Sequence, residues 1–330
     1  MNLRKKSTAI KLLFTLLLIY FLYNFIDVTF EDILNSIVHA KKRFLMAAAL
    51  LMPVTISLQI IKWYQLLRDQ GAQVPFRSAA VSHLSGMALG IVTPARIGEL
   101  GRAWFLRELP QIKVFSLTIL DKFYSTLAYF SVGVFSLLMF FLPVKDFSAF
   151  QTAAIALALI AIYTFIVLAL IKPEIVSNAF NKYPVFLPKK ELFTRIANVM
   201  AHVVRKKVLF VYGLGSGVWF VVIFQLWLLV NAFSEVNFIN GINNASAAHF
   251  AKTLFPVTLG ELGVREASVI YFFRNQGVTD SAAVSAALLL FLLNVLIPSL
   301  VGVTFLSRLR WGKSINNSKE TTNDSVDVIK

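Results

Sequence analysis

The sequence predicts an all-α protein that crosses a membrane several times. Of its 330 residues, 57% are apolar and only 15% are charged, whereas soluble domains have about 45–50% apolar and about 25% charged residues. The apolar residues also gather in runs long enough to span a bilayer, which takes roughly 20 of them. A soluble protein could not bury this much apolar surface. The composition therefore excludes a soluble globular protein, a disordered chain and a nucleic-acid-binding domain.

Charge and cysteine content narrow the function further. The chain has 32 Lys and Arg against 17 Asp and Glu, a net charge of +15. In an apolar chain this excess is typical of loops on the cytoplasmic side and of attraction to anionic lipid. There is no cysteine, and the four histidines are scattered without metal-ligand spacing. We therefore expect neither a metal site nor a cofactor.

Six apolar runs are predicted to cross the membrane as complete helices. Basic residues precede the first run and no small-residue cleavage site follows it, so we interpret it as a helix and not as a signal peptide. The six predicted spans are Ile10–Ile26, Phe44–Leu67, Val114–Leu142, Ala149–Ile171, Val208–Phe233 and Ser281–Leu306.

Two further apolar segments, 78–106 and 245–273, are interrupted in the middle by proline, glycine and charged residues. Proline and glycine break the hydrogen-bond ladder of a helix, so a continuous lipid-facing helix is not expected there. We predict a re-entrant hairpin or a pair of half-helices in each segment. The residues that make the breaks are Pro94, Gly98 and Gly101 in the first, and Pro256, Gly260 and Gly263 in the second.

The positions of Lys and Arg predict the orientation. Both termini are expected on the cytoplasmic side of the cell membrane, with the first hairpin entering from the cytoplasm and the second from outside. The cluster Lys41-Lys42-Arg43 is the one exception, because it falls on the outer side. Charge alone also permits both interrupted segments to span completely, so that alternative stays open.

One transmembrane domain is expected over residues 1–311. Within it, residues 189–207 have apolar side chains at helical spacing among Lys and Arg, which is typical of an amphipathic helix in the cytoplasmic interface. A loop helix packed on the protein is the alternative. The polar tail 312–330 is predicted to be disordered.

The two breaks carry the same motif. Residues 94–101 (PARIGELG) and 256–263 (PVTLGELG) share Pro, Gly, Glu, Leu and Gly at matching positions. Two such octapeptides, each inside a broken apolar segment, indicate an inverted repeat of the kind found in secondary transporters, with broken helices meeting near the midplane. The N-terminus of the half-helix after each break would then offer N–H groups to a phosphate or carboxylate.

Charged residues around the breaks are the candidate binding site. An ionisable residue at membrane depth costs several kcal/mol unless it is paired or wetted, so a polar cavity is expected. Ion pairs that only lock the bends are the alternative, and Asp121 with Lys122 could instead lie near the interface. The predicted substrate-binding residues are Arg96, Glu99, Arg102, Asp121, Lys122, Glu261, Arg265 and Glu266. We interpret Lys62-Trp63-Tyr64 as an anchor at the headgroups, with a functional role as the alternative. We do not expect His83 and His249 to form a proton relay.

Together these positions resemble a known family. Trp63, the run Pro94-x-x-Ile97-Gly98-Glu99-x-x-Arg102, the pair Asp121-Lys122, and Pro256 followed by Leu262-Gly263-Val264-Arg265-Glu266 look like the lysylphosphatidylglycerol synthase transmembrane, or flippase-like, family. The resemblance runs from about Ile10 to Leu306. It implies a bacterial or archaeal envelope protein. The best understood members join this module to a soluble aminoacyl-transferase domain that makes lysylphosphatidylglycerol, and the module moves that lipid across the bilayer.

The resemblance also implies limits. Stand-alone members handle other lipids, including polyprenyl-linked sugars and hopanoids, and the 330 residues leave no room for the soluble domain, so aminoacyl transfer is not expected. Glu261 stands where the family often has glycine, and Lys122 stands where arginine is more typical. The second hairpin is therefore expected to carry a protonatable group.

The leading hypothesis is a lipid translocase, not an enzyme, for an anionic phospholipid or a polyprenyl-phosphate-linked lipid. Arginines and half-helix N-termini between the hairpins would hold the headgroup. No ATP-binding motif occurs, so an ion gradient, the membrane potential or the lipid gradient would drive transport. The open alternatives are an intramembrane headgroup enzyme, a non-transporting partner of a separately encoded lipid-modifying enzyme, and a transporter of small anions. A homodimer is also left open, and no nucleic-acid partner is expected.

Overall fold

The protein is a bundle of helices, and within the part of the chain that the structure describes five of them are long and apolar enough to cross a membrane. The computed structural model describes residues 30–68, 73–93, 96–106, 108–141, 148–172, 205–255, 261 and 263–306. Within these ranges every regular element is a helix and there is no strand. The membrane-length elements are α3 (Lys42–Arg68), α5 (Gln111–Phe141), α6 (Ala149–Ile171), α9 (Arg205–Phe233), and a run made of α12 (Asp280–Phe291), a π-helical turn η4 (Leu292–Leu296) and α13 (Ile297–Val303). The chain is therefore a multi-pass membrane protein.

Five of the six predicted spans fall on these helices. The sixth, Ile10–Ile26, lies outside the described residues, as do the tail 312–330 and residues 189–204 of the predicted amphipathic helix. Arg205–Lys207, the last part of that prediction, form the first turn of α9.

Contacts of Lys41 with the end of α9 and the loop after it fix one end of the bundle. The short helix α2 (Phe30–His39) leads to Lys41, whose backbone N–H donates to the Ala232 carbonyl over 2.8 Å. The Lys41 ammonium also pairs with Glu235 at 2.6 Å, and this hydrogen bond holds the pKa of the Glu235 carboxyl below its usual value. The start of α3 and the end of α9 therefore lie at the same end.

The first interrupted segment is broken and doubles back on itself. It consists of α4 (Phe76–Ile91) and a 3₁₀ helix, η1 (Ile97–Trp104), which pack against each other. Ser82 donates from its hydroxyl to the Arg102 carbonyl over 3.1 Å, and the Ser78 hydroxyl donates to the Glu108 carboxylate over 2.8 Å. The beginning and the end of this hairpin are thus joined at one end of the bundle. Pro94 lies outside the described residues.

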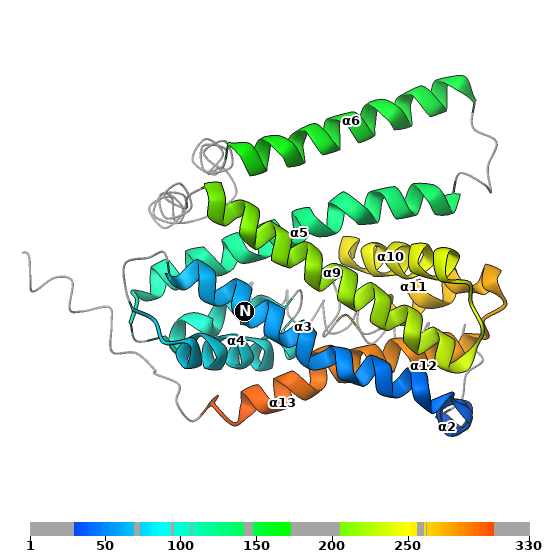
Figure 1. Cartoon of the computed structure of the whole chain (residues 1–330), viewed down its shortest axis with the longest axis horizontal. Coiled ribbons are helices and arrows are strands. Elements are labelled where there is room, and N and C mark those ends of the chain that lie inside the picture. The colour runs from blue at the N-terminus through cyan, green and yellow to red at the C-terminus, as the bar shows by residue number, and fades with distance from the viewer. Residues whose placement is uncertain are drawn as a thin grey trace, which may run out of the picture.

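The second interrupted segment is broken in the same way. It consists of α10 (Phe238–Leu254) and α11 (Val264–Phe273), followed by a short 3₁₀ turn, η3 (Arg274–Gln276). Phe272 near the end of α11 packs against Phe140 near the end of α5, with ring centroids 4.6 Å apart. Figure 1 shows α4 toward the left and α10 and α11 toward the right, so the two hairpins occupy opposite ends of the bundle. Pro256 and Gly260 lie outside the described residues.

Helix α9 runs through the middle and packs on α3, α5, α10 and α12. Its buried residues Trp219 and Val230 belong to a core with the second hairpin, and Val208 and Val211 belong to a separate core that includes Ala79 and Ala103 of the first hairpin. Helix α6 lies at the edge of the bundle (Figure 1), where the Tyr163 hydroxyl donates to the Ser131 carbonyl of α5 over 2.6 Å. Charged side chains of α3, η1, α5, α10 and α11 collect between the two hairpins.

Candidate functional site

The return arm of the first hairpin aligns three charged side chains. The sequence predicted a half-helix, but the arm is a 3₁₀ helix that starts after Arg96, which has a left-handed φ of 52°. A 3₁₀ helix has three residues per turn, so side chains at i and i+3 eclipse each other. Arg96, Glu99 and Arg102 therefore project from one line along the arm. Glycine within η1 weakens the α-helical preference and favours this tighter, short helix.

Glycines on α4 make room for these charges. A side-chain carbon at Gly86 would lie 2.5 Å from Cγ of Arg102, and one at Gly90 would lie 2.8 Å from Cγ of Glu99. Both distances are too short for real contacts. The spacing of four residues places the two glycines on one face of α4, and this face allows the 3₁₀ arm to pack closely against it.

Glu99 is the common partner of three cations. Its carboxylate lies 2.9 Å from Arg96 Nε, 2.7 Å from Arg102 Nη2 and 2.5 Å from Lys122 Nζ. The Glu99 side chain is only 3% exposed. Lys122 from α5 and Arg102 from η1 thus both pair with Glu99, the glutamate of the first motif.

Asp121 forms the second anionic centre. It pairs with Arg102 Nη1 at 3.0 Å and with Lys62 Nζ at 2.9 Å, and Lys62 also donates to the Ser125 hydroxyl. The Arg102 guanidinium lies 5.0 Å from the centroid of the Trp63 ring. The interpretation of Lys62 and Trp63 as a headgroup anchor is therefore wrong, because both are buried and both contact the charge cluster. Sequence could not reveal this, since the partner of Lys62 is 59 positions away.

The second hairpin contributes two ion pairs. Glu261 pairs with Lys252 at 2.5 Å, and Arg265 pairs with Glu266 at 2.5 Å. Glu261 has a left-handed φ of 62°, so the glutamates of the two repeated motifs differ in conformation although their sequences match. Glu266 also accepts the Gly263 N–H over 2.6 Å and caps α11.

Two expectations need correction. Glu266 was predicted to line the cavity, but it serves as a cap behind Arg265 and is not among the lining residues. The half-helix N-termini were predicted to offer free N–H groups, but Gly263 N–H is bound by Glu266 and Gly98 N–H is bound by the Thr93 hydroxyl at 2.7 Å. These two N–H groups are therefore already occupied within the protein.

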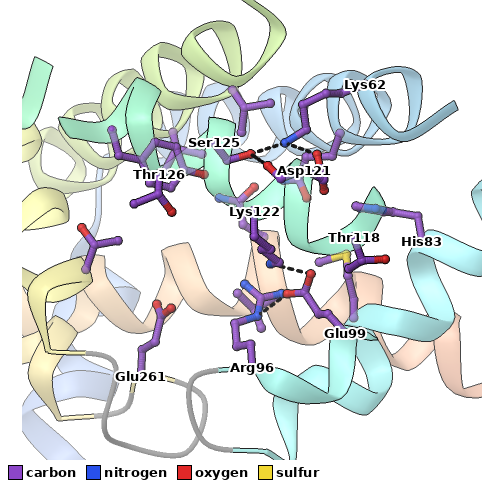
Figure 2. Close-up of a pocket in the computed structure, with 18 of the residues that line it drawn as sticks. Lys62, His83, Arg96, Glu99, Thr118, Asp121, Lys122, Ser125, Thr126 and Glu261 are labelled. Atoms are coloured by element: carbon purple, nitrogen blue, oxygen red, sulfur yellow. Dashed lines mark hydrogen bonds and ion pairs between the residues drawn. The ribbon is translucent and has the colours of Figure 1, made fainter. Parts of the chain in front are cut away.

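A cavity of about 570 Å³ lies between the two hairpins and α5. Figure 2 shows Glu261 on one side of it and Arg96 with Glu99 on the other. Six basic side chains and three acidic ones line it. Arg265 pairs with Glu266, which does not line the cavity, so a surplus of two positive charges remains when both histidines are counted as neutral. The basic side chains are Lys62, Arg96, Arg102, Lys122, Lys252 and Arg265, and the acidic ones are Glu99, Asp121 and Glu261.

Several lining residues were not predicted as binding residues. Lys62, Lys252 and Asn294 each stand alone in an apolar run, and His83 and His249 also line the cavity. His83 is 2% exposed, and neither ring nitrogen has a hydrogen-bond partner among the described residues. The one usable signal was the rule that a polar residue within an apolar span faces the bundle interior.

This cavity is built from parts of the chain that match a known family. A family model for the lysylphosphatidylglycerol synthase TM region matches residues 8–302. The chain belongs to this family. No curated protein matches it.

Membership in the lysylphosphatidylglycerol synthase TM family confirms the resemblance seen in the motifs, because the match contains both hairpins and every lining residue. The family supports a function related to membrane lipids. It also agrees with the multi-pass architecture.

Proposed function

We propose that this protein moves a phosphate-bearing lipid, either an anionic phospholipid or a polyprenyl-phosphate-linked lipid, from one leaflet to the other. The observation that carries this proposal is the surplus of two positive charges, with Glu266 counted against Arg265, in a cavity between two hairpins. The headgroup would enter the cavity while the apolar tails stay in the surrounding lipid.

The charge cluster of the first hairpin supports an anionic ligand. Two carboxylates, Glu99 and Asp121, are shared by four cations, so each cation is only partly neutralised. A charge removed from water costs several kcal/mol unless it is paired. A phosphate among these groups would supply the missing negative charge, and a guanidinium can bind it through two parallel hydrogen bonds.

We propose that both hairpins are re-entrant and enter from opposite faces of the cytoplasmic membrane. Three contacts support this arrangement, because each joins segments that the charge distribution places on one side: Lys41 with Glu235, Ser78 with Glu108, and Lys207 with Gln65. In this orientation the N- and C-termini are cytoplasmic.

We also propose that the chain acts without catalysis. Each of the three acidic lining residues is already held in an ion pair, so none is poised as a general base. The site residues of the proposal are therefore ligands for the headgroup. The roles as an intramembrane headgroup enzyme, or as a partner of a separate lipid-modifying enzyme, become outcomes of the experiment below.

The experiment is transport in reconstituted vesicles. Purified protein in vesicles that contain a fluorescent phosphatidylglycerol analogue should speed the loss of protected fluorophore to a membrane-impermeant quencher. Lys62→Met should slow this exchange at least tenfold, because it removes one cavity charge while Arg102 still pairs with Asp121. Lys41→Met, which removes a surface cation far from the cavity, is the matched control and should transport normally.

Three results would contradict the proposal. Wild-type protein that leaves exchange at the rate of empty vesicles would show that it does not translocate this lipid alone, and would favour the partner role. Conversion of the lipid to a product by pure protein would favour the enzyme. Equal transport by Lys62→Met and wild type would remove the cavity from the mechanism.

A further inference from the structure

A π-helical turn interrupts the last membrane-length helix where it lines the cavity. Residues Leu292–Leu296 form this turn, and the Ile297 N–H donates to the Leu292 carbonyl five residues back. Pro298 has no N–H, so the Asn294 carbonyl cannot receive an α-helical hydrogen bond, which explains the wider turn. Such turns often occur at functional sites.

Asn294 is the one polar residue of this turn, and it lines the cavity with a side chain that is nine-tenths buried. The orientation of the Asn294 amide is fixed by a chain of two hydrogen bonds through Gln225. The Ala48 carbonyl can only accept, and it receives Gln225 Nε2 at 2.7 Å. Gln225 Oε1 therefore faces the other way and accepts Asn294 Nδ2 at 2.5 Å. This leaves Asn294 Oδ1 as an acceptor, and no described residue donates to it.

A buried acceptor without a donor costs free energy, so natural proteins rarely keep one without a reason. Here the hydrogen bond to Gln225 holds the Asn294 side chain in place, but no described residue donates a hydrogen bond to Asn294 Oδ1. Phe291, three residues earlier, also lines the cavity, and the Arg265 guanidinium lies 4.5 Å from its ring centroid. Asn294 thus lines the same cavity as the Arg265 cation.

We propose that Asn294 Oδ1 binds a hydroxyl group of a phosphate ester whose phosphate lies among the cavity cations. This inference rests on the proposed function and narrows its ligand to headgroups that carry a free hydroxyl, such as a glycerol or a sugar. An ammonium donor fits less well, because the lining already has surplus positive charge. Gln225 is a positioning residue that acts through Asn294.

The test compares two lipids that differ only in the hydroxyls. Phosphatidylpropanol has the charge and the shape of phosphatidylglycerol but lacks its two headgroup hydroxyls. Wild-type protein in detergent should bind phosphatidylglycerol about tenfold more tightly, the effect of one well-placed hydrogen bond. Asn294→Leu should abolish this preference and leave phosphatidylpropanol binding within about twofold, while Leu292→Ala in the same π turn should keep the preference.

Equal binding of the two lipids by wild type would overturn the inference. An equal loss of binding to both lipids in a folded Asn294→Leu variant would also overturn it, because the residue would then not distinguish the hydroxyls. If the leucine variant does not fold, Asn294→Ala gives the same comparison. Gln225→Met should lower the preference without changing phosphatidylpropanol binding.

A further binding experiment uses the soluble ester glycerol 3-phosphate as a competitor. Competition only by the lipid assigns the site to a headgroup, and equal competition by glycerol 3-phosphate assigns it to a soluble ester; both retain hydroxyl binding. The readout is separate from transport. A preference without translocation would refute the proposed function alone, and translocation without a preference would refute this inference alone.

Discussion

Replacing Arg102 by alanine is expected to lower the free energy of unfolding by about 3–5 kcal/mol, the usual cost of removing one partner from a buried ion pair. Arg102 is 1% exposed and is the only described residue that pairs with both Glu99 and Asp121. Its side chain also fills the space above Gly86 and lies over the Trp63 ring. Transport should be lost with it. Thermal unfolding in detergent measures the first effect and vesicle exchange measures the second.

Arg274→Ala is the matched control for this variant. Arg274 pairs with Asp280 at 2.8 Å, but the arginine side chain is 65% exposed. An exposed pair contributes less than about 1 kcal/mol, so this control should unfold at nearly the wild-type temperature. Arg102→Lys, which keeps the charge but can reach fewer acceptors, should fall between the two. An Arg102→Ala variant as stable as Arg274→Ala would contradict the assignment of Arg102 as the link between the two carboxylates.

Glu99→Gln should have a different signature. It removes the charge shared by Arg96, Arg102 and Lys122, so the cavity becomes more positive and the protein without lipid should lose about 3–5 kcal/mol of stability. An anionic lipid then replaces the missing charge. A ligand at 100 times its Kd stabilises the folded state by about 2.7 kcal/mol. We therefore expect phosphatidylglycerol to raise the unfolding temperature more in Glu99→Gln than in wild type.

The control lipid for this measurement is zwitterionic phosphatidylcholine, which should give no extra stabilisation. Glu235→Gln is the control variant, because its carboxylate is on the surface and outside the cavity. If phosphatidylglycerol stabilises Glu99→Gln no more than it stabilises wild type, the lipid headgroup does not lie near Glu99. Arg102→Ala should show no such recovery, because a lipid phosphate cannot replace a lost cation.

Local features of the sequence predicted that both segments are interrupted, because proline, glycine and charge act within a few residues. The same holds for the pairing of Glu99 with Arg96 and Arg102, which lie three positions away on either side. Of the predicted break residues, Gly263 caps α11, but Gly98 and Gly101 lie within η1 and not at the break. The 3₁₀ form of the arm was not predicted, since it depends on how closely the arm packs on the glycine face of α4.

Contacts between residues that lie far apart in the chain could not be predicted from the sequence. Lys62 looks like an interfacial anchor because aromatic residues follow it, and only the packing of α3 on α5 brings it to Asp121. The acceptor at Asn294 likewise depends on Gln225 and on a carbonyl of α3. Glu266 was misplaced for the opposite reason: a glutamate three residues after a glycine can fold back to cap its own helix, and here it does.

The central claim is that two hairpins enter the membrane from opposite faces and enclose the charged cavity. Side-specific labelling of single cysteines tests it most directly, because the chain has no cysteine of its own. The exposed residues Arg77 and Pro110 flank the first hairpin, and Asn237 and Asn275 flank the second. We predict that cysteines at 77 and 110 react with an impermeant reagent from one face only, and cysteines at 237 and 275 from the other face only. Labelling of 77 and 110 from different faces, or of all four positions from the same face, would contradict the account.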